Sequence, residues 1–530
     1  MEADGGRAPW RSHTGEWSVL LAALPAVGHL VYLGRIFAAR LTYPADLEWM
    51  EGGQLYHAHR LLHGDPVYGG PDQGFVPFGY GPVHAGALAA VGRVTGLDYW
   101  SGRLLSVVAI VVVAVVLYRQ VVRHTGSGPL GITLGLLATG TIAAGFPVTG
   151  GWFDLVRADS LAIAVPVGAA ALAAEPERLG ERRRWVTLAL LLAASVLTKQ
   201  SNLFLVAWIG LFVLVVDRRA ARRIGLLAVG ATVAALVGLQ VASGGWFLTW
   251  FGLMAHHGLQ PGRLPWALED LGGFAPYLAL VPMLVVVGFR RGWLTHRTVL
   301  WAGMLAAAAP TALVPFLKIG GHPNNLLPIV ALAGPATVLL VVDVGRGMAG
   351  AGGSTARAVP MVKGLGLVGG AALLLGLWYP ASSYVPSAAR RDAADRLNAL
   401  MADLDGGVLV PGSPFLPVRN GRPGGDQVHS MAHFDAWLAG VDDVELERYI
   451  AASEAEWVLI DPYDWAVVWR AGGYERVDRS VPEVTTMTGA VVTPSALYHR
   501  VGRPGPPDHL GRVTDDAGSA ADVRDVPSPP

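Results

Sequence analysis

Residues 43–80 read YPADLEWMEGGQLYHAHRLLHGDPVYGGPDQGFVPFGY and separate two hydrophobic regions of the chain. This polar stretch carries three carboxylates within six positions, Asp46, Glu48 and Glu51, and ends in two aromatic turns rich in glycine and proline. Connections between neighbouring elements are usually a few residues long, so a long one of this composition indicates a functional loop. We therefore expect the rest of the chain to be a scaffold that holds this loop.

The overall composition indicates an integral membrane protein. Of the 530 residues, 52% are hydrophobic and 15% are charged, whereas soluble domains carry about 25% charged residues. The formal net charge is zero, which argues against a nucleic-acid partner. The chain contains no cysteine, so disulfides and thiolate metal sites are excluded.

Hydrophobic runs predict an α-helical polytopic membrane protein with about eleven transmembrane helices. The expected spans are 17–39, 102–122, 129–149, 159–174, 186–198, 202–216, 224–243, 274–289, 298–316, 325–343 and 361–379. The two around the polar bend 198–202 are too short for full crossings, so this bend is expected at membrane depth, covered by protein or lining a cavity. The run 82–95 is also short and is expected to lie flat at the interface.

Clusters of cations predict the orientation of the bundle. They lie at 119–123, 178–184, 218–223, 290–297 and 346–363, all on one side of the expected bundle. The positive-inside rule makes that side cytoplasmic. The N-terminus is then cytoplasmic, and residues 43–80 and everything after about residue 380 lie outside a bacterial plasma membrane.

The chain divides into four expected parts. They are a cytoplasmic tail (1–16), a transmembrane domain (17–379) with a first external loop (41–100), an extracytoplasmic α/β domain (380–502) and a disordered tail (503–530). In the α/β domain the pattern predicts strands at 407–410, 457–460, 490–492 and 497–501, and helices at 388–404, 432–439 and 444–455.

The three carboxylates of the first loop allow two interpretations. In the structural one, Asp46 caps the helix-like run that follows and Glu48 complements its dipole. In the chemical one, a loop carboxylate takes the proton of an alcohol whose oxygen attacks a sugar. The two roles are not exclusive, and the spacing does not choose among Asp46, Glu48 and Glu51.

The segment DLEWME (46–51) and the turns GDPVY (64–68) and YGP (80–82) resemble the first external loop of the GT-C glycosyltransferases. These polytopic enzymes include protein O-mannosyltransferases and aminoarabinose transferases, and the resemblance covers about residues 17–345 in layout. It implies a GT-C-like fold, a polyprenyl-phosphate-sugar donor and inverting transfer to a glycan, lipid or protein acceptor outside the membrane. It also implies a first-loop carboxylate as general base, although the adjacent Asp-Glu pair of the family is absent here.

The second external loop, TGGWFDLVRADS (149–160), carries Asp154, Arg157 and Asp159. They are either a capped helix start with a local Asp–Arg pair, or two cavity-lining carboxylates and an arginine that contacts phosphate. Some GT-C oligosaccharyltransferases bind a divalent metal between first- and second-loop carboxylates. Because the adjacent acidic pattern is absent, no metal or other cofactor is expected, and a divalent ion is the alternative.

Only three of the 40 cationic residues are lysines, and two of them border apolar runs. Lys199 is expected at membrane depth, where an ionisable group costs about 2.5–3.5 kcal/mol at the helix centre, unless its side chain snorkels to the interface. Lys318 begins KIGGHPNNLLP (318–328), which resembles the late loop of GT-C enzymes near the lipid phosphate. Lys199, Lys318 and His322 are therefore candidate phosphate ligands.

The remaining external loop, 244–273, contains several tryptophans that are typical of an interfacial belt. Its His256, His257 and Arg263 are further candidate phosphate contacts.

Three functional hypotheses follow. The first is an inverting glycosyltransferase with a lipid-linked donor. The second is a transporter or flippase of a lipid-linked glycan, which the absence of internal repeats disfavours. The third is a binding protein whose working part is the 380–502 domain, although that domain shows no catalytic constellation.

Overall fold

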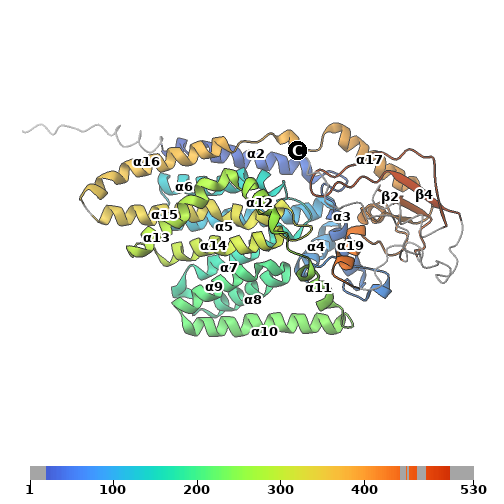
Figure 1. The fold of residues 1–530 in the computed structure, drawn as a ribbon, viewed down its shortest axis with the longest axis horizontal. Coiled ribbons are helices and arrows are strands. Elements are labelled where there is room, and N and C mark those ends of the chain that lie inside the picture. Colours follow the sequence, from blue (N-terminus) through green and yellow to red (C-terminus); the bar gives the residue numbers. More distant parts are fainter. Residues whose placement is uncertain (1–18, 352, 442–448, 450–452, 462–472, 502–530) are drawn as a thin grey trace, which may run out of the picture.

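The computed structural model describes residues 19–351, 353–441, 449, 453–461 and 473–501. The predicted tails, 1–16 and 503–530, and most of the predicted helix 444–455 lie outside these residues. Within the described chain, long helices run side by side along the molecule, and a small α/β region caps one end of them (Figure 1).

Eleven long or medium-length helices make up the described bundle. They are α2 (Leu24–Leu41), α5 (Tyr99–Thr125), α6 (Pro129–Ala144), α7 (Ala158–Ala173), α8 (Arg182–Thr198), α9 (Leu203–Val216), α10 (Arg218–Ala242), α13 (Ala275–Arg290), α14 (His296–Phe316), α15 (Leu327–Gly350) and α16 (Gly353–Gly376). Each predicted span coincides with one of these helices.

Length and composition identify fewer candidate membrane crossings than the eleven predicted spans. Seven described helices are long and apolar enough to cross a membrane, or up to eight if the bent pair Gly366–Gly376 and Ala381–Asp403 counts as one span. Helices α7 and α9 have 16 and 14 residues, fewer than the roughly 20 that a full crossing needs. The multi-pass architecture is confirmed, and the count of eleven stays a prediction.

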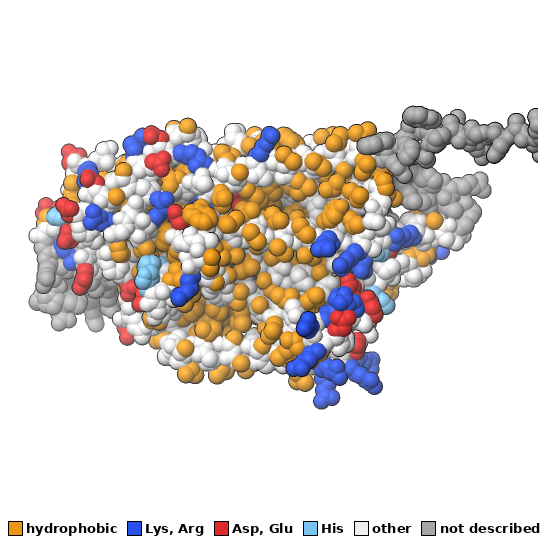
Figure 2. All heavy atoms as spheres, turned by 180° about the vertical axis from the view of Figure 1, so that it is seen from behind, with side chains coloured by type: hydrophobic (Ala, Val, Ile, Leu, Met, Phe, Trp, Pro, Cys, Tyr) orange, Lys and Arg blue, Asp and Glu red, His pale blue; other side chains and the backbone are white. Residues whose placement is uncertain are grey.

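On the face shown in Figure 2, hydrophobic side chains cover a broad area of the bundle, and basic side chains gather at the end away from the α/β region. Exposed hydrophobic residues of the bundle include Val111 on α5 and Leu226 and Val233 on α10. Soluble monomers rarely expose apolar surface of this extent, so this surface fits contact with lipid.

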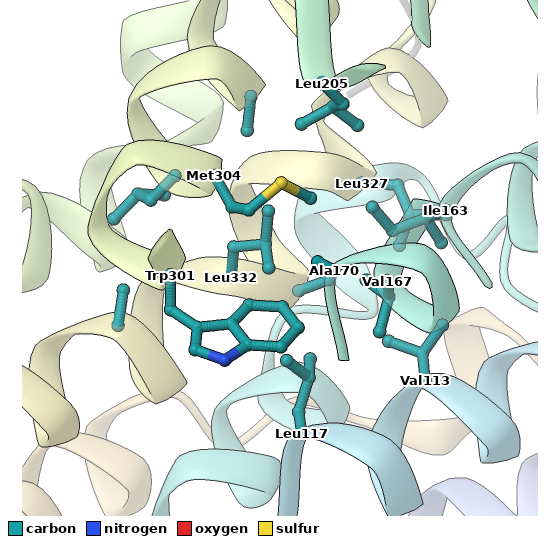
Figure 3. Close-up of a cluster of buried hydrophobic side chains, with 14 of the residues drawn as sticks. Val113, Leu117, Ile163, Val167, Ala170, Leu205, Trp301, Met304, Leu327 and Leu332 are labelled. Carbon is teal, nitrogen blue, oxygen red and sulfur yellow. The ribbon is translucent and has the colours of Figure 1, made fainter. Parts of the chain in front are cut away.

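The interior of the bundle is a close-packed apolar core (Figure 3). Trp301 of α14 and Val167 of α7 are buried in it with side chains from α5, α9 and α15. Helices α9 and α14 approach closely at Gly303, where an added Cβ would lie 1.9 Å from the Trp208 ring. Such packing gives the bundle a rigid end on which loops can be positioned.

The helical hairpin between the cationic clusters is broken where the sequence predicted a polar bend. Helix α8 ends at Thr198, Lys199 is extended, and a 3₁₀ turn over Gln200–Asn202 leads into α9. The Gln200 amide donates to the carbonyls of Gly79 and Phe251. The break is therefore covered by protein, as expected for a polar bend that is predicted to lie at membrane depth.

Short helices surround the same end of the bundle as the α/β region (Figure 1). The first loop contributes α3 (Glu51–His63) and α4 (Pro82–Thr95), and the loop after α10 contributes α11 (Phe247–His256) and α12 (Leu264–Asp270). Trp250 of α11 is fully buried and donates to the Gly69 carbonyl, so it is a packing residue rather than part of an interfacial belt.

The α/β region consists of α17 (Ala388–Asp403), β1 (Val408–Leu409), α18 (Phe415–Arg419), α19 (Ser430–Leu438), β2 (Trp457–Ile460), β3 (Tyr474–Arg476) and β4 (Ala496–Arg500). The sheet order is β1-β2-β4-β3, with β1 parallel to β2 and β4 antiparallel to both of its neighbours. The strand predicted at 490–492 is wrong: Thr486 bonds to Ala490 and Val492 across a tight turn instead. Strand β3 was not predicted.

Candidate active site

The first and second loops meet through a buried ion pair between Glu48 and Arg157. Arg157 Nη1 lies 3.1 Å from Glu48 Oε1 and 3.2 Å from Oε2, and Nη2 donates to the Tyr80 hydroxyl at 2.8 Å. The guanidinium also lies 5.0 Å from the centre of the Trp152 ring. An arginine held on both a carboxylate and an aromatic face has a fixed orientation.

The broken helix brings Lys199 to the same place. Its Nζ lies 2.7 Å from Asp159 Oδ1 and 2.9 Å from Asn325 Oδ1, and Asn324 donates to the same Asp159 oxygen at 2.9 Å. Arg157 Nε is 3.9 Å from the other Asp159 oxygen. The Lys199 side chain is only 16% exposed, so it is held by partners and does not snorkel.

His322 of the late loop completes the group. Its ring stacks on Trp152, with ring centres 5.8 Å apart, and lies 6.3 Å from the centre of the Trp49 ring. Burial lowers the pKa of His322 to about 4, with Arg157 and Arg263 acting in the same direction, so the ring is neutral near pH 7. We call Glu48, Arg157, Asp159, Lys199 and His322 the ionic cluster.

Glu51 lies apart from the ionic cluster and pairs with Arg103, and both of its carboxylate oxygens have hydrogen-bond donors. Arg103 Nη2 is 2.6 Å from Glu51 Oε2 and its Nε is 3.0 Å from Oε1, while the backbone N–H groups of Leu47 and Val156 donate to the same carboxylate. Burial acts to raise the pKa of Glu51, but Arg103 and these hydrogen bonds hold it below its usual value. This pair fixes the shape of the first loop.

Asp46 links the first loop to the α/β region. One oxygen accepts from the Gly52 N–H at 2.7 Å in the first turn of α3, and the other accepts from the Ser413 hydroxyl. Burial, with Glu51 acting in the same direction, raises the pKa of Asp46 to about 7. The N-cap residue of α3 is Met50 rather than the predicted Asp46, and the Asp46 side chain does not touch the ionic cluster.

Asp154 pairs with Arg40 at 3.1 Å, and both side chains are almost fully buried. The local Asp–Arg pair suggested by the sequence therefore does not involve Asp154: Arg157 lies 3.9 Å from Asp159 and pairs more closely with Glu48. Among the described residues, no group of three or more His, Asp or Glu side chains is placed to hold a metal ion.

The other predicted phosphate contacts lie outside the ionic cluster. Lys318 Nζ donates to the Met254 carbonyl, and Arg263 donates to the carbonyls of Lys318 and Gly321. His256 is exposed. His257, the last of the predicted phosphate contacts, is buried against α19, with Nε2 3.4 Å from the Asp435 carbonyl oxygen.

The α/β region covers the first loop through backbone contacts. The N–H groups of Met487 and Thr488 donate to the Leu47 carbonyl, and the His429 ring bonds to the Trp49 carbonyl at 2.8 Å. Asp435 of α19 is nearly buried here, and burial raises its pKa to about 7, with Arg157 opposing the shift. Asp435 lies 3.9 Å from His257 Nε2, and this buried carboxylate was not predicted, since an acidic residue on a short amphipathic helix resembles any solvated one.

Arg40 and Arg103 were also missed as framework residues. Arg103 lies one residue inside the span predicted at 102–122, where the cost of a buried charge could have indicated a carboxylate partner. Arg40 follows the span 17–39 directly and resembles an ordinary interfacial cation.

The described chain therefore defines a polytopic membrane protein with an ionic cluster at one mouth of its helical bundle. It is similar to ArnT from Cupriavidus metallidurans, both in the apo state and bound to undecaprenyl phosphate. The TM-score is 0.55 in both cases, at 14% identity over 91% of this chain and 98% and 99% of those chains. This likeness confirms the GT-C fold that the sequence predicted.

A more distant structure is the Archaeoglobus fulgidus oligosaccharyltransferase tethered with an acceptor peptide. It aligns with a TM-score of 0.45 at 12% identity, over 92% of this chain and 74% of that one. No family model and no curated protein sequence matches the chain.

Proposed function

We propose that the protein is a GT-C-type glycosyltransferase that moves a sugar from a polyprenyl-phosphate donor to an acceptor hydroxyl on the extracytoplasmic side. The ionic cluster carries this proposal, because it joins two carboxylates with two cations at the mouth of a fold like that of ArnT. The undecaprenyl phosphate bound in one ArnT structure supports a donor of the same chemistry.

Glu48 is the first-loop carboxylate that fits the role of general base. The oxygens of Glu51 are taken by Arg103 and two backbone N–H groups, and Asp46 is turned toward Gly52 and Ser413. Glu48 faces the ionic cluster instead: it pairs with Arg157, and one of its oxygens also accepts from the Met50 N–H at 3.0 Å. Burial raises the pKa of Glu48 to about 8, with Arg157 opposing the shift, which brings the carboxyl close to the working range of a base.

In the proposed reaction the acceptor oxygen attacks the anomeric carbon while Glu48 takes the hydroxyl proton. The bond between that carbon and the phosphate oxygen breaks, and its electron pair leaves with the polyprenyl phosphate. Negative charge thus grows on the phosphate, where Lys199 and Arg157 stabilise it electrostatically. Asp159 holds Lys199 in place through the 2.7 Å contact. Attack opposite the leaving group inverts the anomeric centre.

The remaining predicted residues are assigned peripheral roles. Asp154 supports the second loop through Arg40. Lys318, His256, His257 and Arg263 line the late loop and the loop after α10, where the acceptor or the outer part of the donor is proposed to pass. A flippase would use the same cations but would leave the sugar–phosphate bond intact.

The test uses membranes that contain the protein and a panel of undecaprenyl-phosphate-linked hexoses and pentoses, with endogenous membrane acceptors. We expect release of undecaprenyl phosphate with one of these donors, and a loss of at least about 10²-fold in rate for Glu48→Gln. The exposed Glu269 provides a matched control, Glu269→Gln, which should retain the parent rate. Donor translocation without release of lipid phosphate would support the flippase instead.

A further inference from the structure

A cavity lies in the bundle away from the ionic cluster. It has a volume of about 770 Å³ and is enclosed by α6, α13, α15 and α16. Its wall is mostly aliphatic, with Leu134 and Leu137 from α6 and Val338 and Val341 from α15. No residue of the ionic cluster lines it, so it is a separate site.

The cavity extends along the helices toward the basic end of the bundle. On α15 its wall runs from Gly334 to Ala349, which corresponds to about 22 Å of helix at 1.5 Å per residue. A hydrocarbon core is about 30 Å thick, so one leaflet accounts for roughly half of that. The cavity is therefore long enough for an acyl chain that enters from the leaflet at the basic end.

Glycines keep this space open. An added Cβ at Gly345, Gly366 or Gly369 would meet nothing within 4 Å, and both Gly366 and Gly369 are exposed. These positions leave both a hollow and an opening to the side of the bundle. A chain of methylene groups would bury apolar surface there without displacing protein atoms.

A cation lies at the basic end of the cavity. Arg346 lines the cavity and is exposed, and its Nη2 donates to the His124 carbonyl at 2.9 Å. The nearby Asp343 is already bonded to His124 and Thr295, and no carboxylate among the described residues forms an ion pair with Arg346. A guanidinium has five donors, so most of those of Arg346 are available to a ligand.

We propose that this cavity binds one anionic glycerophospholipid from the leaflet at the basic end. An acyl chain occupies the hollow beside Gly345 and Gly366, and the phosphate accepts hydrogen bonds from Arg346. A lipid of this charge matches both the arginine and the anionic lipids of a cytoplasmic leaflet. The inference does not depend on the proposed transferase activity.

The test is native mass spectrometry of the purified protein with phosphatidylglycerol and with phosphatidylcholine of the same acyl chains. We expect one retained phosphatidylglycerol that binds at least about tenfold more tightly than phosphatidylcholine. Arg346→Ala should remove this preference, and Gly345→Phe should weaken binding of both lipids. The controls are Arg223→Ala and Gly230→Leu on α10, which are exposed positions outside the cavity.

Equal lipid binding by the parent, Arg346→Ala and Gly345→Phe would overturn the proposal. Displacement of phosphatidylglycerol by an equal concentration of undecaprenyl phosphate would also overturn it, because the cavity would then hold the isoprenoid chain. A variant that fails to fold is identified by its melting temperature, and Gly366→Leu then replaces it as the cavity-filling change.

Discussion

Glu48 and Glu51 lie three positions apart in the chain, yet their surroundings give them different tasks. Glu51 neutralises the fully buried Arg103, so Glu51→Gln leaves an uncompensated buried cation. Removing one partner of such a pair costs about 3–5 kcal/mol. We expect a clearly lower melting temperature in detergent for Glu51→Gln and little change for Glu269→Gln, which alters an exposed carboxylate. A Glu51→Gln protein as stable as the parent would contradict the framework role.

The raised pKa of Glu48 predicts the pH dependence of the reaction. A general base must be ionised, and a carboxyl with a pKa of about 8 is mostly protonated at pH 6. We therefore expect the transfer rate at saturating donor to rise with pH and to level off above about pH 8. The control is the melting temperature over the same range. A rate that is flat between pH 6 and 9 would remove Glu48 from this role.

The partners of these residues could not be predicted from local sequence. Glu48 and Arg157 are 109 positions apart, and Glu51 and Arg103 are 52 apart. The types of group at the site were predicted, because loops with carboxylates and cations stand out against apolar spans. Which carboxylate meets which cation depends on how α2, α5 and α7 pack, and a single sequence does not contain that information.

At the scale of the element, the break between α8 and α9 places Lys199 in an extended conformation, with its ammonium group on Asp159. A continuous helix would point this side chain in another direction. Lys199→Ala should weaken donor binding or turnover by about 10–150-fold, as expected for a charged contact worth roughly 1.5–3 kcal/mol. Lys318→Ala should change donor KM and kcat less, since the Lys318 ammonium group bonds to the Met254 carbonyl. Donor KM and kcat for both variants provide the measurement. Parent-like kinetics for Lys199→Ala would leave only a structural role for the break.

The elements that the sequence predicted well are those with a strong periodic or apolar signal. The bundle helices and strands β2 and β4 belong to this class. Strand β3 has three residues, two of them charged and exposed, and it is ordered by pairing with β4 rather than by its own pattern. The segment 490–492 has a strand-like composition, but the side chain of Thr486 directs it into a turn.

At the scale of the whole molecule, the α/β region and the basic end lie at opposite ends of the bundle (Figures 1 and 2). They should therefore face opposite sides of the membrane. The chain lacks cysteine, so Asp395→Cys on α17 and Arg183→Cys on α8 can be made directly. In intact spheroplasts we expect an impermeant maleimide to label only the cysteine at position 395. Labelling of position 183 alone would invert the predicted orientation.

The order in which the ribosome makes these parts has a consequence for the cell. All five residues of the ionic cluster have been synthesised once the chain reaches residue 322. The groups of the α/β region that bond to the first loop are synthesised much later; they are Ser413, His429 and Met487. A nascent chain with every helix inserted still has an unfinished active site. For the proposed transferase, activity would thus begin only after the C-terminal region has folded onto the first loop, so that partly made chains would not consume the donor.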